Sequence, residues 1–277
     1  MLTAPNVIVE IVCAGTFVLA LFEALDRGTR SLSTLLAGVL FGLLAEVFFV
    51  VLFDGYQYGH FALNLPVGKG ESIPLWVGLG WGTIIWVSML AGTRSGLPWY
   101  GAPILDAFCA LSLDLTLDPI AEHLGWWHWQ RPAQFFGIPC DNFIGWLVIV
   151  GAYSFANRAL FERWPEGKSR TRDSLLPVVS LVPAILAVVA MQYGVPFIYA
   201  LLGEPLTLLV LLLGGGIPLF TAWKPTALTW DPPTVAIPAM YQGLMLALLL
   251  TTRGPEALIV VFWAVAALSL FLFRWRT

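Results

Sequence analysis

Charged side chains are scarce in this sequence. Only 11% of its 277 residues are Asp, Glu, Lys or Arg, compared with about a quarter in soluble domains. Hydrophobic residues make up 58% of the chain, and the mean hydropathy is +0.82. Water would solvate such a surface poorly, so we expect an integral membrane protein.

Cysteine, histidine and basic runs are scarce as well. The three cysteines are scattered through apolar sequence, which argues against a disulfide framework or a CxxC site. The three histidines are too few for the multi-histidine iron sites of membrane desaturases, so no metal is predicted. The net charge of −3 and the lack of a long basic run argue against nucleic acid as a partner. No Gly-rich phosphate loop or nucleophile elbow occurs, so we expect chemistry without a cofactor.

Long apolar runs predict the fold. A bilayer crossing takes about 20 apolar residues, and charges, Gly or Pro divide the chain into nine such runs. The predicted fold is all-α, a polytopic transmembrane helix bundle of nine spans, with eight as the alternative because the seventh and eighth are the least distinct. The first run has the composition of a retained span and not of a signal peptide. The expected spans are residues 5–26, 31–53, 73–93, 99–119, 141–161, 174–193, 197–220, 235–252 and 256–273.

The positions of Lys and Arg predict the orientation, because these residues concentrate in short cytoplasmic loops. With nine spans and the N-terminus outside, 11 of the 14 basic residues lie on one side and 3 on the other. We therefore expect an N-out, C-in protein of a bacterial or archaeal cytoplasmic membrane. The larger group is Arg27, Arg30, Arg94, Arg158, Arg163, Lys168, Arg170, Arg172, Lys224, Arg274 and Arg276, and the smaller is Lys69, Arg131 and Arg253.

We expect one integral membrane domain over residues 1–277. A basic linker at about residues 158–173 separates five predicted helices at about 5–161 from four at about 174–273. Its charge suits contact with anionic lipid.

Two pairs of glycines have the GxxxG spacing within predicted spans. They are Gly38 with Gly42 and Gly78 with Gly82. Small residues at this spacing let helix backbones approach closely, so we expect close helix packing there.

Carboxylates lie inside the predicted spans, where each ionisable side chain costs about 2.5–3.5 kcal/mol to insert. Asp114 and Asp118 are four residues apart, which places them on one face of the fourth helix. Two carboxyl groups in one water-poor site do not both ionise easily, so we expect an acid beside a base. Glu46, deep in the second span, is a further candidate for the same cavity. The structural alternative is that Asp118 ends a helix before Pro119 and Asp114 bonds a neighbouring helix.

Short motifs in the middle of the chain resemble a known family. The motifs are Asp114-x3-Asp118-Pro119, Gly125-Trp126-x-x-Trp129 and Phe136-Gly137-x-Pro139-x-x-Asn142-Phe143-x-Gly145-Trp146, with a looser match at Gly55-Tyr56-Gln57-Tyr58. They resemble the membrane carotenoid biosynthesis protein family, which includes carotenoid 1,2-hydratases and bisanhydrobacterioruberin hydratase. The resemblance is carried by roughly residues 46–146.

The resemblance implies hydration of the terminal C1–C2 double bond of an acyclic ψ-end carotenoid such as lycopene, without a cofactor. We expect Asp114 to protonate the alkene, Asp118 to orient water and accept its proton, and Glu46 to be the alternative acid. Aromatic faces stabilise cations, so a loop rich in Trp beside these acids suits a carbocation. The expected substrate-binding residues are Tyr56, Tyr58, Trp126, Trp129, Asn142 and Trp146.

Two residues depart from the family pattern, so the substrate or reaction can differ. Asp141 stands where a neutral residue is expected, and Asp54 where an aromatic residue is expected. One alternative is a carotenoid or terpenoid cyclase or isomerase with the same protonation step. Another is a proton-coupled transporter with Asp114 and Asp118 as the relay. The expected partners are a carotenoid or other long polyene, membrane lipids, and other enzymes of the pathway.

Overall fold

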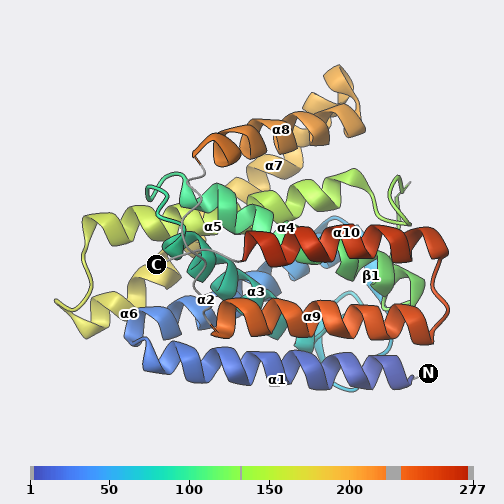
Figure 1. Cartoon of the computed structure of the whole chain (residues 1–277), viewed down its shortest axis with the longest axis horizontal. Coiled ribbons are helices and arrows are strands. Elements are labelled where there is room, and N and C mark those ends of the chain that lie inside the picture. Colours follow the sequence, from blue (N-terminus) through green and yellow to red (C-terminus); the bar gives the residue numbers. More distant parts are fainter. Residues whose placement is uncertain (1–2, 132, 223–231, 274–277) are drawn as a thin grey trace.

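The computed structural model is a bundle of long helices lying side by side (Figure 1). It describes residues 3–131, 133–222 and 232–273. A π-helix, η1 (Phe48–Leu52), continues the second helix. The α-helices are α1 (Ala4–Asp26), α2 (Thr29–Val47), α3 (Leu75–Arg94), α4 (Ala102–His123), α5 (Cys140–Arg163), α6 (Arg170–Val179), α7 (Leu181–Leu202), α8 (Glu204–Ala222), α9 (Pro232–Thr251) and α10 (Glu256–Leu272).

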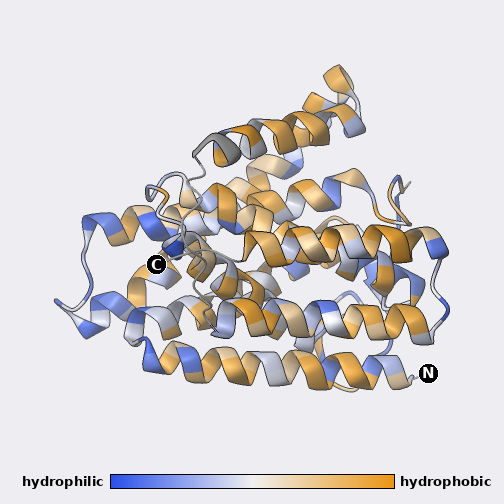
Figure 2. Ribbon diagram, in the orientation of Figure 1, coloured by the Kyte–Doolittle hydropathy of each residue, from blue (hydrophilic) through white to orange (hydrophobic). Residues whose placement is uncertain are grey.

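Apolar residues dominate the helices along their length, and hydrophilic residues gather in the connections (Figure 2). Large apolar side chains such as Ile11, Phe22 and Val260 are more than half exposed. A surface of this kind suits lipid, so the prediction of a mostly helical membrane protein is confirmed. Within the described residues, six helical segments are long and apolar enough to cross a membrane: Ala4–Asp26, Thr29–Leu52, Leu75–Arg94, Cys140–Arg163, Arg170–Leu202 and Pro232–Thr251.

The helix boundaries follow most of the predicted spans closely. The predicted sixth span, residues 174–193, is divided between α6 and α7 at Ser180. α4 continues past Pro119, where the fourth span was expected to end. α7 runs through Pro196 to Leu202, so the predicted boundary between the sixth and seventh spans, at residues 193–197, is wrong. A proline removes one helical hydrogen bond without always ending a helix. The chain turns instead at Gly203, whose φ of 76° favours glycine.

The connections between helices lie at the two ends of the bundle. In Figure 1 the N-terminal end lies near the α9–α10 connection, and the α5–α6 connection lies at the opposite end. The predicted basic linker, residues 158–173, comprises this second connection together with the end of α5 and the start of α6. Three basic residues used for the orientation, Lys224, Arg274 and Arg276, lie outside the described residues.

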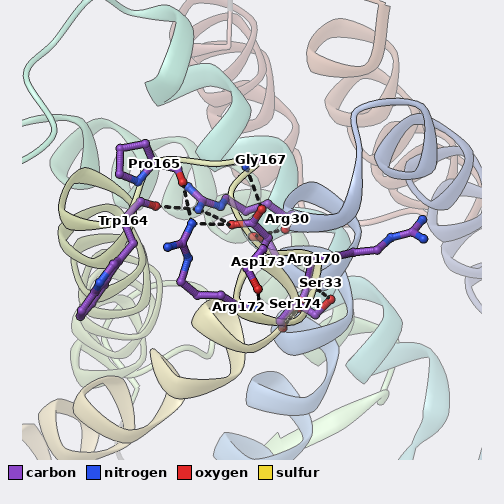
Figure 3. A network of polar contacts seen from close by, with 11 residues as sticks. Arg30, Ser33, Trp164, Pro165, Gly167, Arg170, Arg172, Asp173 and Ser174 are labelled. Atoms are coloured by element: carbon purple, nitrogen blue, oxygen red, sulfur yellow. Dashed lines mark hydrogen bonds and ion pairs between the residues drawn. The ribbon is translucent and has the colours of Figure 1, made fainter.

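A buried ion pair anchors the basic linker to α2 (Figure 3). Arg30 Nη2 lies 2.6 Å from Asp173 Oδ1 and donates a 2.7 Å hydrogen bond to the backbone oxygen of Trp164. The other oxygen of Asp173 accepts a hydrogen bond from the backbone N–H of Gly167 at 2.9 Å. Because buried charges are tolerated when they are paired and hydrogen-bonded, this network holds the linker against the bundle.

Glycines bring α2 and α3 into close contact, as their spacing predicts. A Cβ atom on Gly38 would lie 3.2 Å from the Cα atom of Gly82. A Cβ atom on Gly42 would collide with the side chain of Trp81. The two helices therefore pack backbone against backbone, and the indole of Trp81 lies over Gly42.

Two short antiparallel sheets occur between helices, which the all-α prediction did not include. The strands are β1 (Tyr56–Tyr58), β2 (Asn64–Gly68), β3 (Glu71–Pro74) and β4 (Trp127–Trp129). β2 pairs with β3, while β1 pairs with the distant β4, with Tyr56 opposite Trp129 and Tyr58 opposite Trp127. The second pairing brings the Tyr-rich and Trp-rich segments together at one end of the bundle.

Replacing Gly82 by Ala should destabilise the fold. The added Cβ would lie 2.9 Å from the backbone nitrogen of Val39 and 3.0 Å from the backbone oxygen of Leu35. Because backbone atoms of a helix cannot relieve a clash by side-chain rotation, we expect the free energy of unfolding to fall by about 1–3 kcal/mol. Thermal unfolding in detergent, followed by circular dichroism, measures the change.

The matched control is Gly243→Ala in α9, where nothing lies within 4 Å of the added Cβ. It should leave the unfolding midpoint unchanged or raise it, because Ala favours a helix over Gly. Equal midpoints for wild type and Gly82→Ala would contradict the close packing of α2 on α3.

Candidate active site

A cavity of about 340 Å³ lies within the bundle, at the end where β1 pairs with β4. Helices α2, α3, α4, α5 and α7 contribute to its wall. Most of the residues predicted for the site line it, namely Glu46, Tyr56, Tyr58, Asp118, Trp129, Asn142 and Trp146. The other two predicted residues, Asp114 and Trp126, are buried outside the lining.

Asp114 and Asp118 share one hydrogen-bond donor. Nδ2 of Asn142, in the first turn of α5, lies 3.2 Å from Oδ2 of Asp114 and 2.5 Å from Oδ2 of Asp118. Asp114 is fully buried and Asp118 is 4% exposed. Asp118 lines the cavity, whereas Asp114 lies one helical turn farther from the β1–β4 end. Asp118 is therefore the carboxyl group of the pair that a bound molecule would meet.

The surroundings of this pair differ from those of Asp106, which lies two turns earlier on α4. Asp106 pairs with Arg158 at 2.8 Å and accepts a 2.5 Å hydrogen bond from Ser154. Within the described residues, no Lys or Arg forms an ion pair with Asp114 or Asp118. Of these three aspartates of α4, Asp106 is thus neutralised by a cation, and Asp114 and Asp118 are joined by a neutral amide.

Glu46 accepts hydrogen bonds at both carboxylate oxygens. The hydroxyl groups of Tyr56 and Tyr58 donate to Oε2, the second at 2.6 Å. Trp81 Nε1 donates to Oε1 at 2.8 Å. These three donors fix the orientation of the carboxyl group and occupy its oxygens, so Glu46 is poorly placed to pass a proton to a molecule in the cavity.

Trp81 is a further residue of the site and is not among the residues predicted from the sequence. Its indole packs over Gly42, which lies one turn before Glu46 on α2. It also stacks on Trp146, with ring centroids 4.0 Å apart and an interplanar angle of 25°. The sequence signal for this contact is the spacing of Gly42 and Glu46, which lie one helical turn apart. An aromatic ring that packs on Gly42 also reaches the carboxyl group of Glu46.

Strand alternation decides which Trp residues face the cavity. Successive strand residues point to opposite sides, so Trp127 and Trp129 share the face of β4 that meets Tyr56 and Tyr58 of β1. The ring centroids of Tyr56 and Trp129 are 4.6 Å apart, and those of Tyr58 and Trp127 are 5.8 Å apart. Trp126 points away and is fully buried among other aromatic rings. Because β4 is a strand, Trp127 lines the cavity in place of the predicted Trp126.

One end of the cavity is polar. Arg131, Asp141, Tyr199 and Glu204 line it. Arg131 Nη1 lies 2.5 Å from Asp141 Oδ2, so the charge of Asp141 is neutralised locally. Asp141, one of the two departures from the family pattern, is therefore a wall residue. The other, Asp54, is exposed with a φ of 49° and lies outside the lining.

Comparison with known proteins adds to this geometry. The sequence profile of the carotenoid biosynthesis protein family matches residues 6–213. Over 148 residues the chain is 30% identical to bisanhydrobacterioruberin hydratase from Haloarcula japonica. This alignment covers 48% of the chain and 48% of the relative, so the chain spans about half the length of the curated relative it matches. No solved structure matches the chain.

Stability should fall at high pH because of Tyr56 and Tyr58. Burial, followed by the nearby charge of Glu46, raises the pKa of both phenols well above the usual value of 10.0. A pKa raised in the folded state stabilises that state while the phenol is neutral, so this stability is present below about pH 10 and is lost as the pH rises toward the folded pKa. We expect the thermal midpoint to decline above pH 10, less steeply for the double variant Tyr56→Phe/Tyr58→Phe.

The control for this titration is Tyr100→Phe, because Tyr100 is 62% exposed. It should follow the wild-type curve at each pH. A double variant that declines as steeply as the wild type would show that the buried phenols do not cause the loss of stability.

Proposed function

Because this chain belongs to the carotenoid biosynthesis protein family, we propose that it hydrates the terminal C1–C2 double bond of an acyclic ψ-end carotenoid such as lycopene. The product is a tertiary alcohol, and the enzyme is a hydro-lyase that needs no cofactor. The main support is a buried pair of carboxyl groups at a cavity with aromatic walls. The name of the archaeal relative supports the same class of reaction.

Asp118 is the proton donor in the proposed reaction. Two carboxyl groups that share one buried site do not both ionise easily, so the pair formed with Asp114 holds a proton. Asp118 transfers this proton to C2 of the alkene and leaves a tertiary cation at C1. The donor role expected for Asp114 from the sequence is assigned here to Asp118, because Asp118 lines the cavity and Asp114 does not. Asp114 acts through Asn142 and Asp118 and is a positioning residue.

Aromatic rings and Glu46 stabilise the cation. The rings of Trp129, Trp146 and Tyr56 line the cavity, and π-faces attract positive charge. Glu46 lies on the same wall and is oriented by its three donors. Such preorganised groups need no reorientation as charge develops, which is the main source of electrostatic catalysis.

Water completes the proposed reaction. Asn142 lines the cavity beside Asp118 and positions the water molecule. The water oxygen bonds to C1, and its surplus proton passes to the carboxylate of Asp118. One water molecule is added in total, and the acid pair returns to its starting state.

The reaction takes place in the cell membrane on this proposal. The chain crosses a bacterial or archaeal cytoplasmic membrane nine times with its N-terminus outside, as the distribution of 11 and 3 basic residues favours. A carotenoid dissolved in the bilayer is then directly available to the bundle.

Expression of the chain in a lycopene-producing cell tests the reaction. We expect new pigments that are heavier than lycopene by one water, or by two if both ends react. Mass spectrometry of the extracted pigments measures this. A new pigment with the mass of lycopene would instead indicate a cyclase or isomerase, because those reactions lose the added proton and gain no water.

Substitution of the acid pair tests the assigned roles. Asp118→Asn should lower the hydration rate by about 100-fold to 10,000-fold, the usual contribution of a general acid. Asp114→Asn should cause a smaller loss and shift the pH profile of the rate, because the remaining acid no longer shares its proton. Pigment analysis gives the rates, and thermal midpoints show whether each variant is folded.

The matched control is Glu23→Gln, which changes a partly exposed carboxylate of α1 that pairs with Arg27. Its activity should stay within about twofold of wild type, since surface ion pairs contribute little. A folded and fully active Asp118→Asn variant would remove Asp118 as the acid.

A further inference from the structure

The cavity is small for a carotenoid. Its volume of about 340 Å³ is near the lower end of the range for pockets that enclose drug-sized ligands, about 300–1,000 Å³. A carotenoid is much longer than such ligands, and its conjugated chain cannot fold up. Only its end group fits beside Asp118, so the rest of the molecule must leave the cavity.

One wall of the cavity is a single layer of side chains. Phe49 of η1 and Phe53, the residue directly after η1, contribute to this wall, and α7 contributes Met191, Val195 and Pro196. Pro196 lines the cavity and is an exposed residue, and the other four are only partly buried. No second layer of described residues therefore separates the cavity from the outside at this wall.

The outer side of this wall is strongly apolar. Tyr193 and Phe197 of α7 are 71% and 69% exposed, and Leu52 of η1 is 63% exposed. In Figure 1, α8 and the end of α7 that joins it extend away from the other helices. The rings of Phe53 and Tyr193 meet across the boundary, with centroids 6.3 Å apart. Lipid chains would therefore reach the edge of the cavity.

Both segments at this boundary depart from regular α-helix. η1 is a π-helix that follows α2 almost directly after Glu46, and such turns often occur at functional sites. Pro196 lies inside α7, where it removes a backbone hydrogen bond. We therefore expect η1 and α7 to separate more easily than two regular, closely packed helices would.

We propose that the polyene enters and leaves the cavity sideways from the bilayer, between η1 and α7, and that its chain stays in this opening while its end group reacts. This inference rests on the proposed function, because it takes the ligand to be a polyene. Phe53 and Tyr193 form the edge of the opening. The polar end at Arg131, Asp141 and Glu204 is left to water.

Val195→Trp tests the opening, because a bulky indole at this lining position narrows it. We expect turnover of a full-length carotenoid to fall by about tenfold or more. Hydration of a short isoprenoid with the same terminal double bond should change by less than about twofold, because that molecule fits inside the cavity. Ile198→Trp, on the same helix but outside the lining, should leave both rates unchanged. Equal losses for both substrates, or no loss for either, would overturn the proposal.

Glu204→Trp distinguishes the two ends of the cavity. Glu204 lines the polar end, so its substitution should affect long and short substrates alike. A loss confined to the long substrate in Glu204→Trp would mean that the carotenoid enters through the polar end, and the sideways route would be wrong.

Binding without turnover separates this proposal from the proposed function. A bound carotenoid quenches Trp fluorescence, and Val195→Trp and Ile198→Trp each add one indole to the chain. Weaker binding of lycopene by Val195→Trp than by Ile198→Trp supports the opening even where no hydrated product forms, and equal binding overturns it. A wild-type protein that binds lycopene and hydrates neither substrate would refute the proposed function alone.

Discussion

One amide group, the side chain of Asn142, joins the two carboxyl groups on which the proposed chemistry depends. Inside a bundle surrounded by lipid, a polar group without a partner costs several kcal/mol. The first turn of α5 must therefore lie opposite the second half of α4, in the one register that brings Asn142 between Asp114 and Asp118. Helix packing and acid chemistry are thus set by the same contact.

The comparison with Asp106 shows why the partner of a buried acid matters. Asp106 has the Arg158 cation beside it and closes a structural network of charges between helices. Among the described residues, the hydrogen-bond donor that Asp114 and Asp118 share is the neutral amide of Asn142. A cation favours the charged carboxylate, whereas two carboxyl groups held together favour retention of a proton. α4 therefore carries both a structural acid and an acid that is available for chemistry. The partner that α5 supplies, Arg158 or Asn142, determines the role of each.

Much of this arrangement can be predicted from hydropathy and helical period, and the remainder depends on tertiary contacts. The helix positions follow from apolar runs, and the spacing of Asp114 and Asp118 places them on one face. Spacing does not give the rotation of α4 about its axis, which decides that Asp118 lines the cavity. The exchange of Trp126 for Trp127 follows from the pairing of β1 with β4, segments far apart in the sequence. No local pattern reveals such a pairing, because strand formation depends on its partner.

The cavity lies between a tightly packed wall and a loosely packed one, and this asymmetry suits a reaction on a lipid. On one side, Gly42 lets Trp81 approach α2, and Trp81 in turn holds Glu46. Groups on a wall packed to backbone contact keep their positions, as stabilisation of a developing cation requires. On the other side, Met191, Val195 and Pro196 of α7 form a thin wall, and Pro196 itself is exposed. A rigid wall at both sides would exclude a long polyene, and a loose wall at both sides would leave the acids poorly oriented.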